Sequence, residues 1–152
     1  MRRKDRERDS AFAYEILRDC EYATLATINA DGTPYCIPIS PVLIGDVMYF
    51  HCALEGQKLD NIKVNNKVCI SCVRHTKLLP EIFGTEFEST VAKGICEIVL
   101  DDAEKTKALR ELSLKYASEN ADAIDDEIAG ALHKTGVCKV IIEEITGKAN
   151  IS

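Results

Sequence analysis

Short extended runs joined by tight turns make up most of this chain, and no other feature of the sequence constrains its fold as strongly. Apolar and β-branched residues recur in six stretches, which are residues 22–28, 33–43, 47–52, 67–74, 86–100 and 136–146. Turns connect most of these stretches, and helical crossovers are few, so neighbouring strands are expected to pair antiparallel. We therefore predict a mainly β (α+β) fold in which an antiparallel sheet closes into a small barrel with helices packed outside.

The connections add detail to this prediction. The turn Asn29-Ala30-Asp31-Gly32 is typical of a β-hairpin, and Gly45-Asp46 indicates a second one. The first three runs are therefore expected to form a three-stranded meander. Helical spacing predicts helices over residues 10–20, 55–66 and 121–132. Asp101 and Glu104 form a capping-box pattern that opens a further helix.

Composition and charge exclude several classes of protein. The chain has 152 residues, of which 46% are hydrophobic, which fits a single domain over residues 1–152 with residues 1–9 as a flexible basic arm. Twenty-five acidic residues against 19 basic ones give a formal net charge of −6, a poor match for nucleic acid. No apolar run approaches the roughly 20 residues of a membrane span, and no signal peptide is visible. We expect a cytoplasmic protein without membrane insertion.

Seven cysteines raise the question of disulfides or metal binding. Their number is odd, and most lie inside apolar runs, where a reduced thiol behaves as a small hydrophobe. The single C-x-x-C pair, Cys69 and Cys72, falls on a predicted strand, so its sulfurs should point to opposite faces. The three histidines lack the short spacing of zinc ligands. We therefore expect core thiols and no metal site.

Three of the four prolines, Pro34, Pro38 and Pro41, fall in the second run. Each removes a hydrogen-bond donor from the sheet, so this strand is predicted to be irregular or to lie at a sheet edge. Its free backbone groups are then available to a ligand. A bulged barrel corner without a ligand explains the prolines equally well.

The passage from the third run into the next helix is a second candidate site. Lys58 falls in the first helical turn, where a cation is disfavoured unless an anion such as a phosphate neutralises both the lysine and the helix dipole. His51 ends the strand beside this turn and suits hydrogen bonding or proton transfer. A solvated lysine and a structural histidine are the alternatives. No G-x-G pattern occurs, so a dinucleotide fingerprint and a P-loop are absent.

These residues belong to a longer pattern that resembles a known family. The pattern runs A-T-L-A-T-x-x-x-D-G-x-P-Y-x-x-P over residues 23–38, Y-F-H over 49–51, G-x-K-L-D-N over 56–61 and S-T-V-x-x-G over 89–94. It resembles the pyridoxamine 5′-phosphate oxidase-like flavin-binding split barrels and, within them, the 5-nitroimidazole reductase branch. The resemblance covers residues 12–146.

The resemblance implies a six-stranded split barrel that forms a homodimer and binds FMN at two sites shared between the subunits. It implies ring contacts from the second strand, phosphate contacts from the helix start, and contacts across the interface from the fifth strand. It also implies a catalytic histidine beside the flavin, here His51. The other corresponding residues are Ile37, Pro38, Ile39 and Ser40, then Gln57 and Lys58, then Ser89 and Thr90.

The chain departs from the pyridoxamine phosphate oxidases of this family where they bind phosphate. Those enzymes carry an arginine near the position of Ile37, Ser-Arg-Lys where this chain has Gly56-Gln57-Lys58, and arginines near the carboxyl terminus. This chain has no arginine after Arg110. We therefore do not expect oxidation of pyridoxamine phosphate, and FAD is an alternative to FMN in the same groove.

The resulting hypothesis is a flavin-dependent oxidoreductase. NAD(P)H or a partner reduces the flavin, and a small acceptor such as a nitroimidazole or another nitroaromatic takes the electrons. His51 protonates or hydrogen-bonds that acceptor. One alternative is a non-enzymatic flavin- or haem-binding carrier or sensor on the same fold, with His51 and His75 as candidate haem ligands. Another is a purely structural dimerisation barrel.

Overall fold

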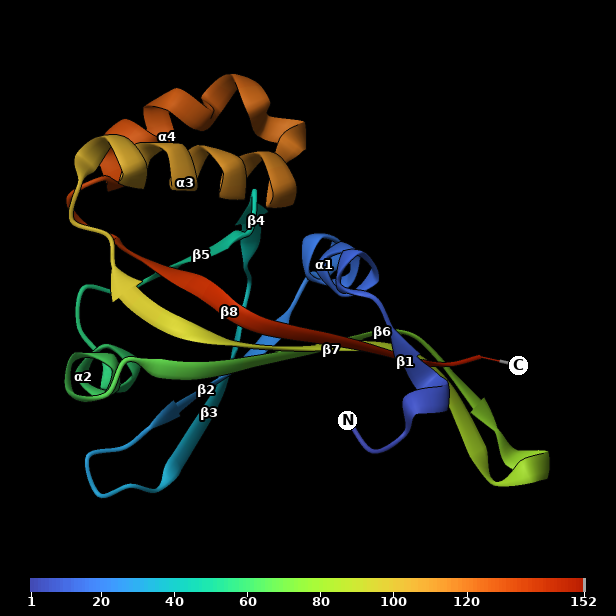
Figure 1. Cartoon of the computed structure of the whole chain (residues 1–152). Coiled ribbons are helices and arrows are strands. Elements are labelled where there is room, and N and C mark those ends of the chain that lie inside the picture. The colour runs from blue at the N-terminus through green and yellow to red at the C-terminus, as the bar shows by residue number, and fades with distance from the viewer. Residues whose placement is uncertain (152) are drawn as a thin grey trace.

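The computed structural model describes residues 1–151 and contains one curled antiparallel sheet with flanking helices (Figure 1). The strand order is β3-β2-β6-β7-β8-β5-β4, and β1 pairs with β8. The strands are β1 (Glu7–Arg8), β2 (Ala23–Ile28), β3 (Pro34–Ile39), β4 (Val42–Ile44), β5 (Val47–Cys52), β6 (Lys67–Leu79), β7 (Gly84–Ile98) and β8 (Gly136–Asn150). The predicted split barrel is confirmed, and β1 and β4 are short additions to its six principal strands.

The helices lie around this sheet. They are α1 (Ser10–Asp19), α2 (Gln57–Val64), α3 (Asp102–Tyr116) and α4 (Ile124–Ala131), with 3-10 turns η1 (Lys4–Arg6), η2 (Pro80–Ile82) and η3 (Ser118–Ala123). Within residues 1–151, none of them is long and apolar enough to cross a membrane.

Both predicted hairpins form, one between β2 and β3 and one between β4 and β5, but the prediction that they join into a three-stranded meander is wrong. β2 and β3 pair antiparallel from Ala23↔Ile39 to Ile28↔Pro34. The run 33–43 then breaks at Ser40, and β4 pairs with β5 at the opposite end of the sheet. Proline cannot donate to a strand ladder, which explains why this run cannot continue through the sheet. β3 is an edge strand, as its prolines predict.

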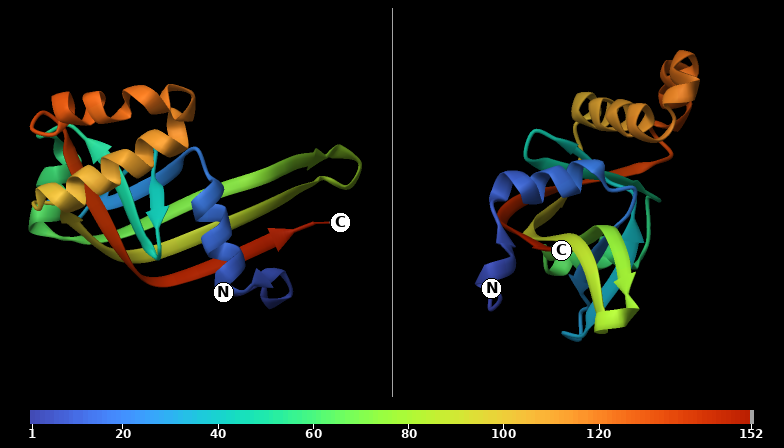
Figure 2. Two further views of the ribbon diagram at one scale, coloured as in Figure 1. Left: turned by 90° about the horizontal axis from the view of Figure 1, so that it is seen from above. Right: turned by 90° about the vertical axis from the view of Figure 1, so that its right-hand side faces the viewer.

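Helix α1 closes the interior of the barrel. Asp9 caps its N-terminus by accepting a hydrogen bond from the Phe12 amide at 2.9 Å. Ile16 and Leu17 are fully buried against the inward side chains of the strands. A Cβ atom on Gly147 of β8 would lie 3.1 Å from Phe12, so glycine lets α1 pack directly on that strand. Figure 2 shows α1 crossing β8.

Helices α3 and α4 cover the outer face of the sheet near β4 and β5 and enclose a second, smaller core (Figure 1). Asp101 caps α3 by accepting a hydrogen bond from the Glu104 amide at 2.8 Å. The Glu104 carboxylate turns to the sheet instead of completing the capping box. It accepts hydrogen bonds from the Tyr49 hydroxyl at 2.7 Å and from Lys139 at 2.9 Å. One carboxylate thus fastens α3 to β5 and β8.

The hairpin of β6 and β7 extends beyond the rest of the molecule as an arm (Figures 1 and 2). β6 is longer than the predicted run 67–74, because its pairing with β7 resumes after a register shift between Arg74 and Lys77. Leu78, Ile82 and Phe83 near the tip are 75%, 70% and 100% exposed. The arm therefore presents apolar side chains to its surroundings.

The amino-terminal segment joins the sheet. Residues 1–9, expected to be a flexible basic arm, contain the turn η1 and the strand β1, in which Glu7 pairs with Lys148 of β8.

All seven cysteines are free thiols. Four of them are buried, in agreement with the expected core thiols: Cys20, Cys72, Cys96 and Cys138.

Candidate functional site

A groove lies between helix α3 and the strand ends beneath it. Its central pocket has a volume of about 310 Å³ and brings together Ser40, which follows β3, and His51, near the end of β5. Leu109, Leu112 and Tyr116 of α3 form the facing wall. Two residues predicted from separate strands therefore share one pocket.

Two further hollows extend this pocket along α3. One of about 210 Å³ shares His51 and adds Glu127 of α4 and Thr135. The other, of about 300 Å³, shares Ser40 and adds Lys115. We call the three hollows together the α3 groove. A larger hollow of about 390 Å³ lies beside the β6–β7 arm and contains none of the predicted site residues.

His51 borders the middle of the α3 groove. It pairs with Val137 of β8, and strand alternation puts its side chain on the same face as Tyr49, toward α3. The imidazole is exposed and makes no hydrogen bond with any other residue among 1–151. Both ring nitrogens are therefore available to a ligand.

The last turn of α3 fixes the bend that carries Ser40. The Pro41 carbonyl accepts hydrogen bonds from Lys115 Nζ and from the Tyr116 hydroxyl, both at 2.7 Å. Burial lowers the pKa of Lys115 and raises the pKa of Tyr116. This role of Lys115 was not predicted, because its one signal in the sequence is a basic residue in the last helical turn.

The edge strand β3 presents the other predicted ring contacts. It pairs with β2 alone, so its outer backbone edge has no strand neighbour among the described residues. Ile37 is half-buried, Pro38 is exposed and Ile39 points into the barrel core. A ligand at β3 would therefore bind mainly to the backbone groups of its outer edge and less to these side chains.

The start of α2 has the geometry of an anion-binding site, with backbone donors that no side chain caps. Gly56 precedes the helix with φ of 155°, and no side chain caps the helix there. The amides of Gln57, Lys58 and Leu59 belong to the first turn, where backbone donors lack helical partners. Lys58 is half-buried and forms no ion pair with a residue among 1–151. Amides, helix dipole and ammonium together favour a bound anion.

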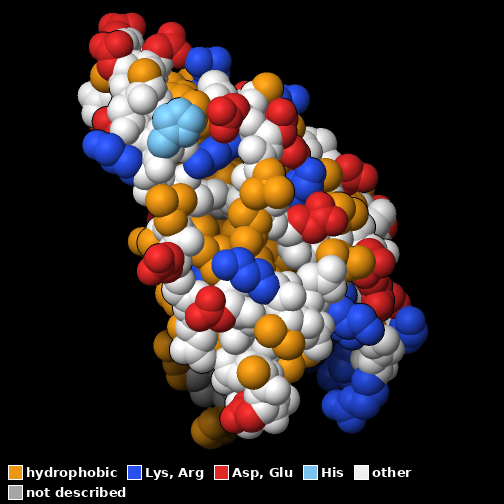
Figure 3. All heavy atoms as spheres, turned by 90° about the vertical axis from the view of Figure 1, so that its left-hand side faces the viewer, with side chains coloured by type: hydrophobic (Ala, Val, Ile, Leu, Met, Phe, Trp, Pro, Cys, Tyr) orange, Lys and Arg blue, Asp and Glu red, His pale blue; other side chains and the backbone are white. Residues whose placement is uncertain are grey.

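A cluster of side-chain amides ties this helix start to the β2–β3 hairpin. Gln57 Nε2 donates to Asn29 Oδ1 at 2.8 Å, and Asn61 Nδ2 donates to Asn29 and to the Thr27 hydroxyl, each at 2.9 Å. Asn61 is only 6% exposed. These contacts fasten α2 to β2 and to the turn that leads into the edge strand β3. Figure 3, which faces the side carrying α2, shows a hollow with apolar walls and basic side chains in front of it.

Ser89 and Thr90, the predicted contacts from the fifth strand, lie far from the α3 groove. They sit on β7 opposite Lys148 and Gly147, whereas the His51 end of the sheet meets β7 at Ile98. Eight strand residues correspond to about 25 Å. Thr90 is 1% exposed and its hydroxyl donates to the Thr146 carbonyl at 3.2 Å. Within one chain, the structure does not bring these two residues to the groove.

No metal centre accompanies these features. Among residues 1–151, no group of three or more His, Cys, Asp or Glu side chains is arranged to hold a metal ion.

The fold and its openings define a class: a small antiparallel split barrel with an exposed edge strand, an uncapped helix start and a groove beside them. The chain belongs to the pyridoxamine 5′-phosphate oxidase family, whose profile matches residues 9–149. No curated protein matches the chain in sequence.

Solved structures share this architecture. A candidate 5-nitroimidazole antibiotic resistance protein from Bacteroides thetaiotaomicron is 25% identical, with a TM-score of 0.78 over 93% of this chain and 84% of the other. A flavocytochrome from Azotobacter vinelandii is 20% identical, with a TM-score of 0.86 over 100% and 72% of the two chains. An FAD-binding protein from Mesorhizobium loti is 20% identical, with a TM-score of 0.70 over 96% and 98%. The last two likenesses establish the fold alone.

Proposed function

We propose that this protein is a flavin-dependent oxidoreductase that passes electrons from NAD(P)H to a small acceptor such as a nitroaromatic compound. The observation that carries the proposal is the start of α2, an uncapped helix N-terminus with an unpaired lysine, hydrogen-bonded to the hairpin of an edge strand. Membership of the family and the likeness to the Bacteroides protein support the same reading.

The start of α2 suits the phosphate of FMN. Lys58 and the free amides of the first turn would hold the phosphate oxygens, and the helix dipole favours the negative charge. Gln57 is already oriented by its hydrogen bond to Asn29, so its side chain loses little conformational entropy when the phosphate binds. Lys58 is the only cation of this turn, which keeps FAD as an alternative ligand.

The outer edge of β3 suits the polar rim of the flavin ring, which would lie along Ile37, Pro38, Ile39 and Ser40. When bound, the flavin supplies the electron-transfer chemistry. His51 would hydrogen-bond the acceptor or deliver a proton to its polar atom from a free ring nitrogen. Helix α3 shields this position from part of the solvent, which strengthens polar contacts made there.

We also propose a homodimer, because Ser89 lies too far from the groove of its own chain and is not fully buried. Ser89 shares the outer sheet face with Val73 and Val91, which are 53% and 37% exposed. An apolar strip on an exposed sheet face favours pairing with a second copy. Sedimentation should give the dimer mass, and Val91→Lys should shift it to the monomer. A monomeric wild-type protein that binds flavin would contradict this part of the proposal.

Absorption spectroscopy of the purified protein tests the main proposal. We expect paired flavin bands, either as purified or after titration with FMN, and weaker uptake of FAD. Anaerobic NAD(P)H should bleach these bands, and a nitroaromatic acceptor should restore them. Protein that takes up neither flavin contradicts the proposal. A Soret band would favour the haem-binding carrier, and flavin that NAD(P)H leaves oxidised would favour a flavin carrier.

Two substitutions separate binding from electron transfer. Lys58→Ala should weaken FMN binding about tenfold or more, because it removes a charge-assisted contact worth about 1.5–3 kcal/mol. His51→Ala should slow turnover while leaving FMN affinity nearly unchanged. Lys63→Ala, in the last turn of the same helix, is the matched control and should change neither. Equal effects of all three substitutions would reject these roles.

A further inference from the structure

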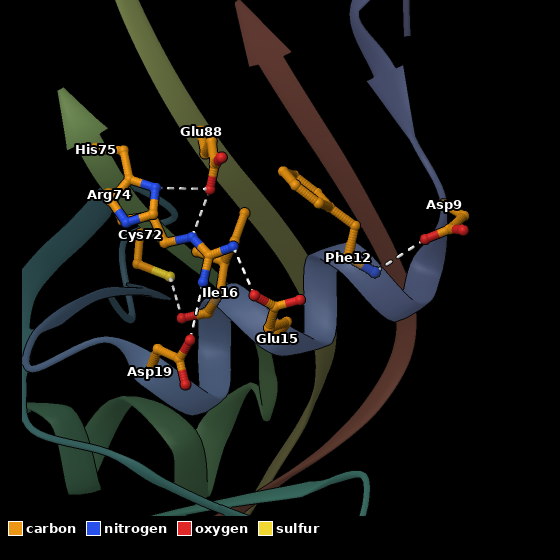
Figure 4. A network of polar contacts seen from close by, with 9 residues as sticks. All are labelled: Asp9, Phe12, Glu15, Ile16, Asp19, Cys72, Arg74, His75 and Glu88. Carbon is orange, nitrogen blue, oxygen red and sulfur yellow. Dashed lines mark hydrogen bonds and ion pairs between the residues drawn. The ribbon is translucent and has the colours of Figure 1, made fainter. Parts of the chain in front are cut away.

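Two thiols meet beneath the last turn of α1. Cys20 follows this helix directly, and Cys72 points inward from β6. Both side chains belong to the same buried core cluster, and each thiol influences the ionisation of the other. Cys20 Sγ donates to the Leu17 carbonyl at 3.2 Å. Cys72 Sγ lies 4.0 Å from the carbonyl of Ile16, the preceding residue of the helix (Figure 4). Neighbouring carbonyl groups of one helical turn therefore position both sulfurs beneath the end of α1.

The surroundings make the two thiols unequal. The interaction with Cys72 lowers the pKa of Cys20, and the charge of Lys115 acts in the same direction, although burial and Asp19 oppose it. The interaction with Cys20, together with burial, raises the pKa of Cys72. Lys115 bonds a neutral carbonyl and forms no ion pair with a residue among 1–151, so its charge is available to a thiolate. An activated thiol beside a protonated one is the arrangement of attacking and resolving cysteines.

A hollow lies beside the Cys20 end of this pair. The hollow at the Lys115 end of the α3 groove is lined by Asp19, Glu21, Tyr22, Ser40, Lys115 and Tyr116. Asp19 and Glu21 flank Cys20 in the chain, and the Tyr116 hydroxyl lies 3.4 Å from the Cys20 carbonyl. Cys20 itself is 8% exposed. The other buried thiols differ: Cys96 and Cys138 are 2% and 0% exposed inside the barrel.

We propose that Cys20 and Cys72 form an intramolecular disulfide when the protein meets a hydroperoxide. The Cys20 thiolate attacks one peroxide oxygen, the O–O bond breaks, and Cys20 becomes a sulfenic acid. The leaving oxygen takes up the proton that Cys20 released. Cys72 then attacks the Cys20 sulfur, an S–S bond forms, and the sulfenic oxygen leaves as water with the Cys72 proton. Two thiols lose two electrons and two protons, and hydrogen peroxide becomes two waters.

This oxidation is coupled to the groove through the backbone. The Cys20 carbonyl lies 3.4 Å from the hydroxyl of Tyr116, which also holds the Pro41 carbonyl beside Ser40. The disulfide would tie the end of α1 to β6 and fix one end of the groove wall. The proposal does not depend on the flavin, since both thiols and Lys115 belong to the protein itself.

Mass spectrometry of the whole protein treated with hydrogen peroxide tests the proposal. We expect the loss of two hydrogen atoms, located by peptide mapping to a Cys20–Cys72 link and reversed by dithiothreitol. Cys36→Ser removes the exposed thiol and should leave this product unchanged. Cys72→Ser should stop at a Cys20 sulfenic acid that dimedone traps. The disulfide should also raise the melting temperature by several degrees, because it closes a long loop.

Lys115→Met tests the role of the charge. It should slow formation of the disulfide about fivefold or more, whereas Lys107→Met, at an exposed position of the same helix, should leave the rate unchanged. Circular dichroism verifies that each variant is folded. Wild-type protein that forms no link, links other cysteines, or oxidises Cys20 and Cys72 no faster than Cys96 and Cys138 would overturn the proposal. Equal rates in the two lysine variants would overturn the role of Lys115.

Discussion

Helices α1 and α3 pack on the same sheet but cover it in different ways. α1 seals the barrel, and its Ile16 and Leu17 are completely buried. α3 covers the outer face only in part: Leu109 and Leu112 also line the pocket that holds Ser40 and His51. The sealed side therefore provides stability, whereas the partly covered side leaves the space in which a ligand can bind.

The ionic contacts of the two helices follow the same division. Arg74 of β6 bonds Glu88 at 2.5 Å, Asp19 at 2.8 Å and Glu15 at 2.9 Å, so it joins α1 to two strands (Figure 4). The side chains of Arg74 and Glu88 are only 16% and 11% exposed. On α3, Glu104 and Lys139 are 29% and 23% exposed. We expect the more buried network to contribute more to stability.

The largest difference should come from truncating the apolar anchor of each helix. Ile16→Ala leaves a cavity in a closed core and should cost about 3–5 kcal/mol of unfolding free energy. Leu112→Ala opens onto an existing pocket that water can enter, so it should cost about 2–3 kcal/mol. Urea denaturation measures both values. Equal costs, or a larger cost for Leu112→Ala, would show that α3 seals its face as tightly as α1 does.

A smaller difference should appear between the two ionic contacts. Arg74→Met leaves the buried Glu88 without its arginine and should cost about 2–4 kcal/mol. Glu104→Gln keeps an acceptor for Tyr49 but loses the ion pair with Lys139, and should cost about 1 kcal/mol or less. The same denaturation assay compares them. A cost for Glu104→Gln that matches the cost for Arg74→Met would remove the distinction.

The smallest expected effect is a dependence of the stability of the fold on pH, caused by Glu88. Burial opposes ionisation of Glu88, but the hydrogen bonds from Arg74 and His75 outweigh it and lower the pKa of Glu88. A carboxyl group with a lowered pKa stabilises the fold above its unfolded pKa of about 4.3, and this stability is lost as the pH falls through the lower folded value. Melting temperatures from about pH 7 to about pH 3 should therefore drop less steeply in Glu88→Gln. Identical slopes would contradict this assignment.

Much of the fold was predictable because its signals are local. The turn at 29–32, the cap at Asp101 and the prolines of β3 each act within a few residues. The splitting of run 33–43 and the length of the arm were not predictable, because they depend on pairing with β5 and β7. Local pattern carries little information about such distant partners.

The candidate site also has parts that local sequence predicts and parts that it does not. The uncapped start of α2 and the edge position of β3 follow from residues 56–58 and from the prolines. The α3 groove joins Ser40 and His51 to residues of α3 and α4 that lie more than 50 positions away in the sequence. No spacing rule connects these segments. The positions of Lys115 and Asn61 became visible only once the strands and helices were placed together.

Hydrogen exchange of the protein with and without FMN tests the central claim most directly, that the ligand binds on the partly covered side and not in the sealed barrel. FMN should slow exchange in residues 37–40 and 56–61 and leave exchange in α1 unchanged. Slower exchange confined to α1 and the barrel interior, or no change at saturating FMN, would contradict the account.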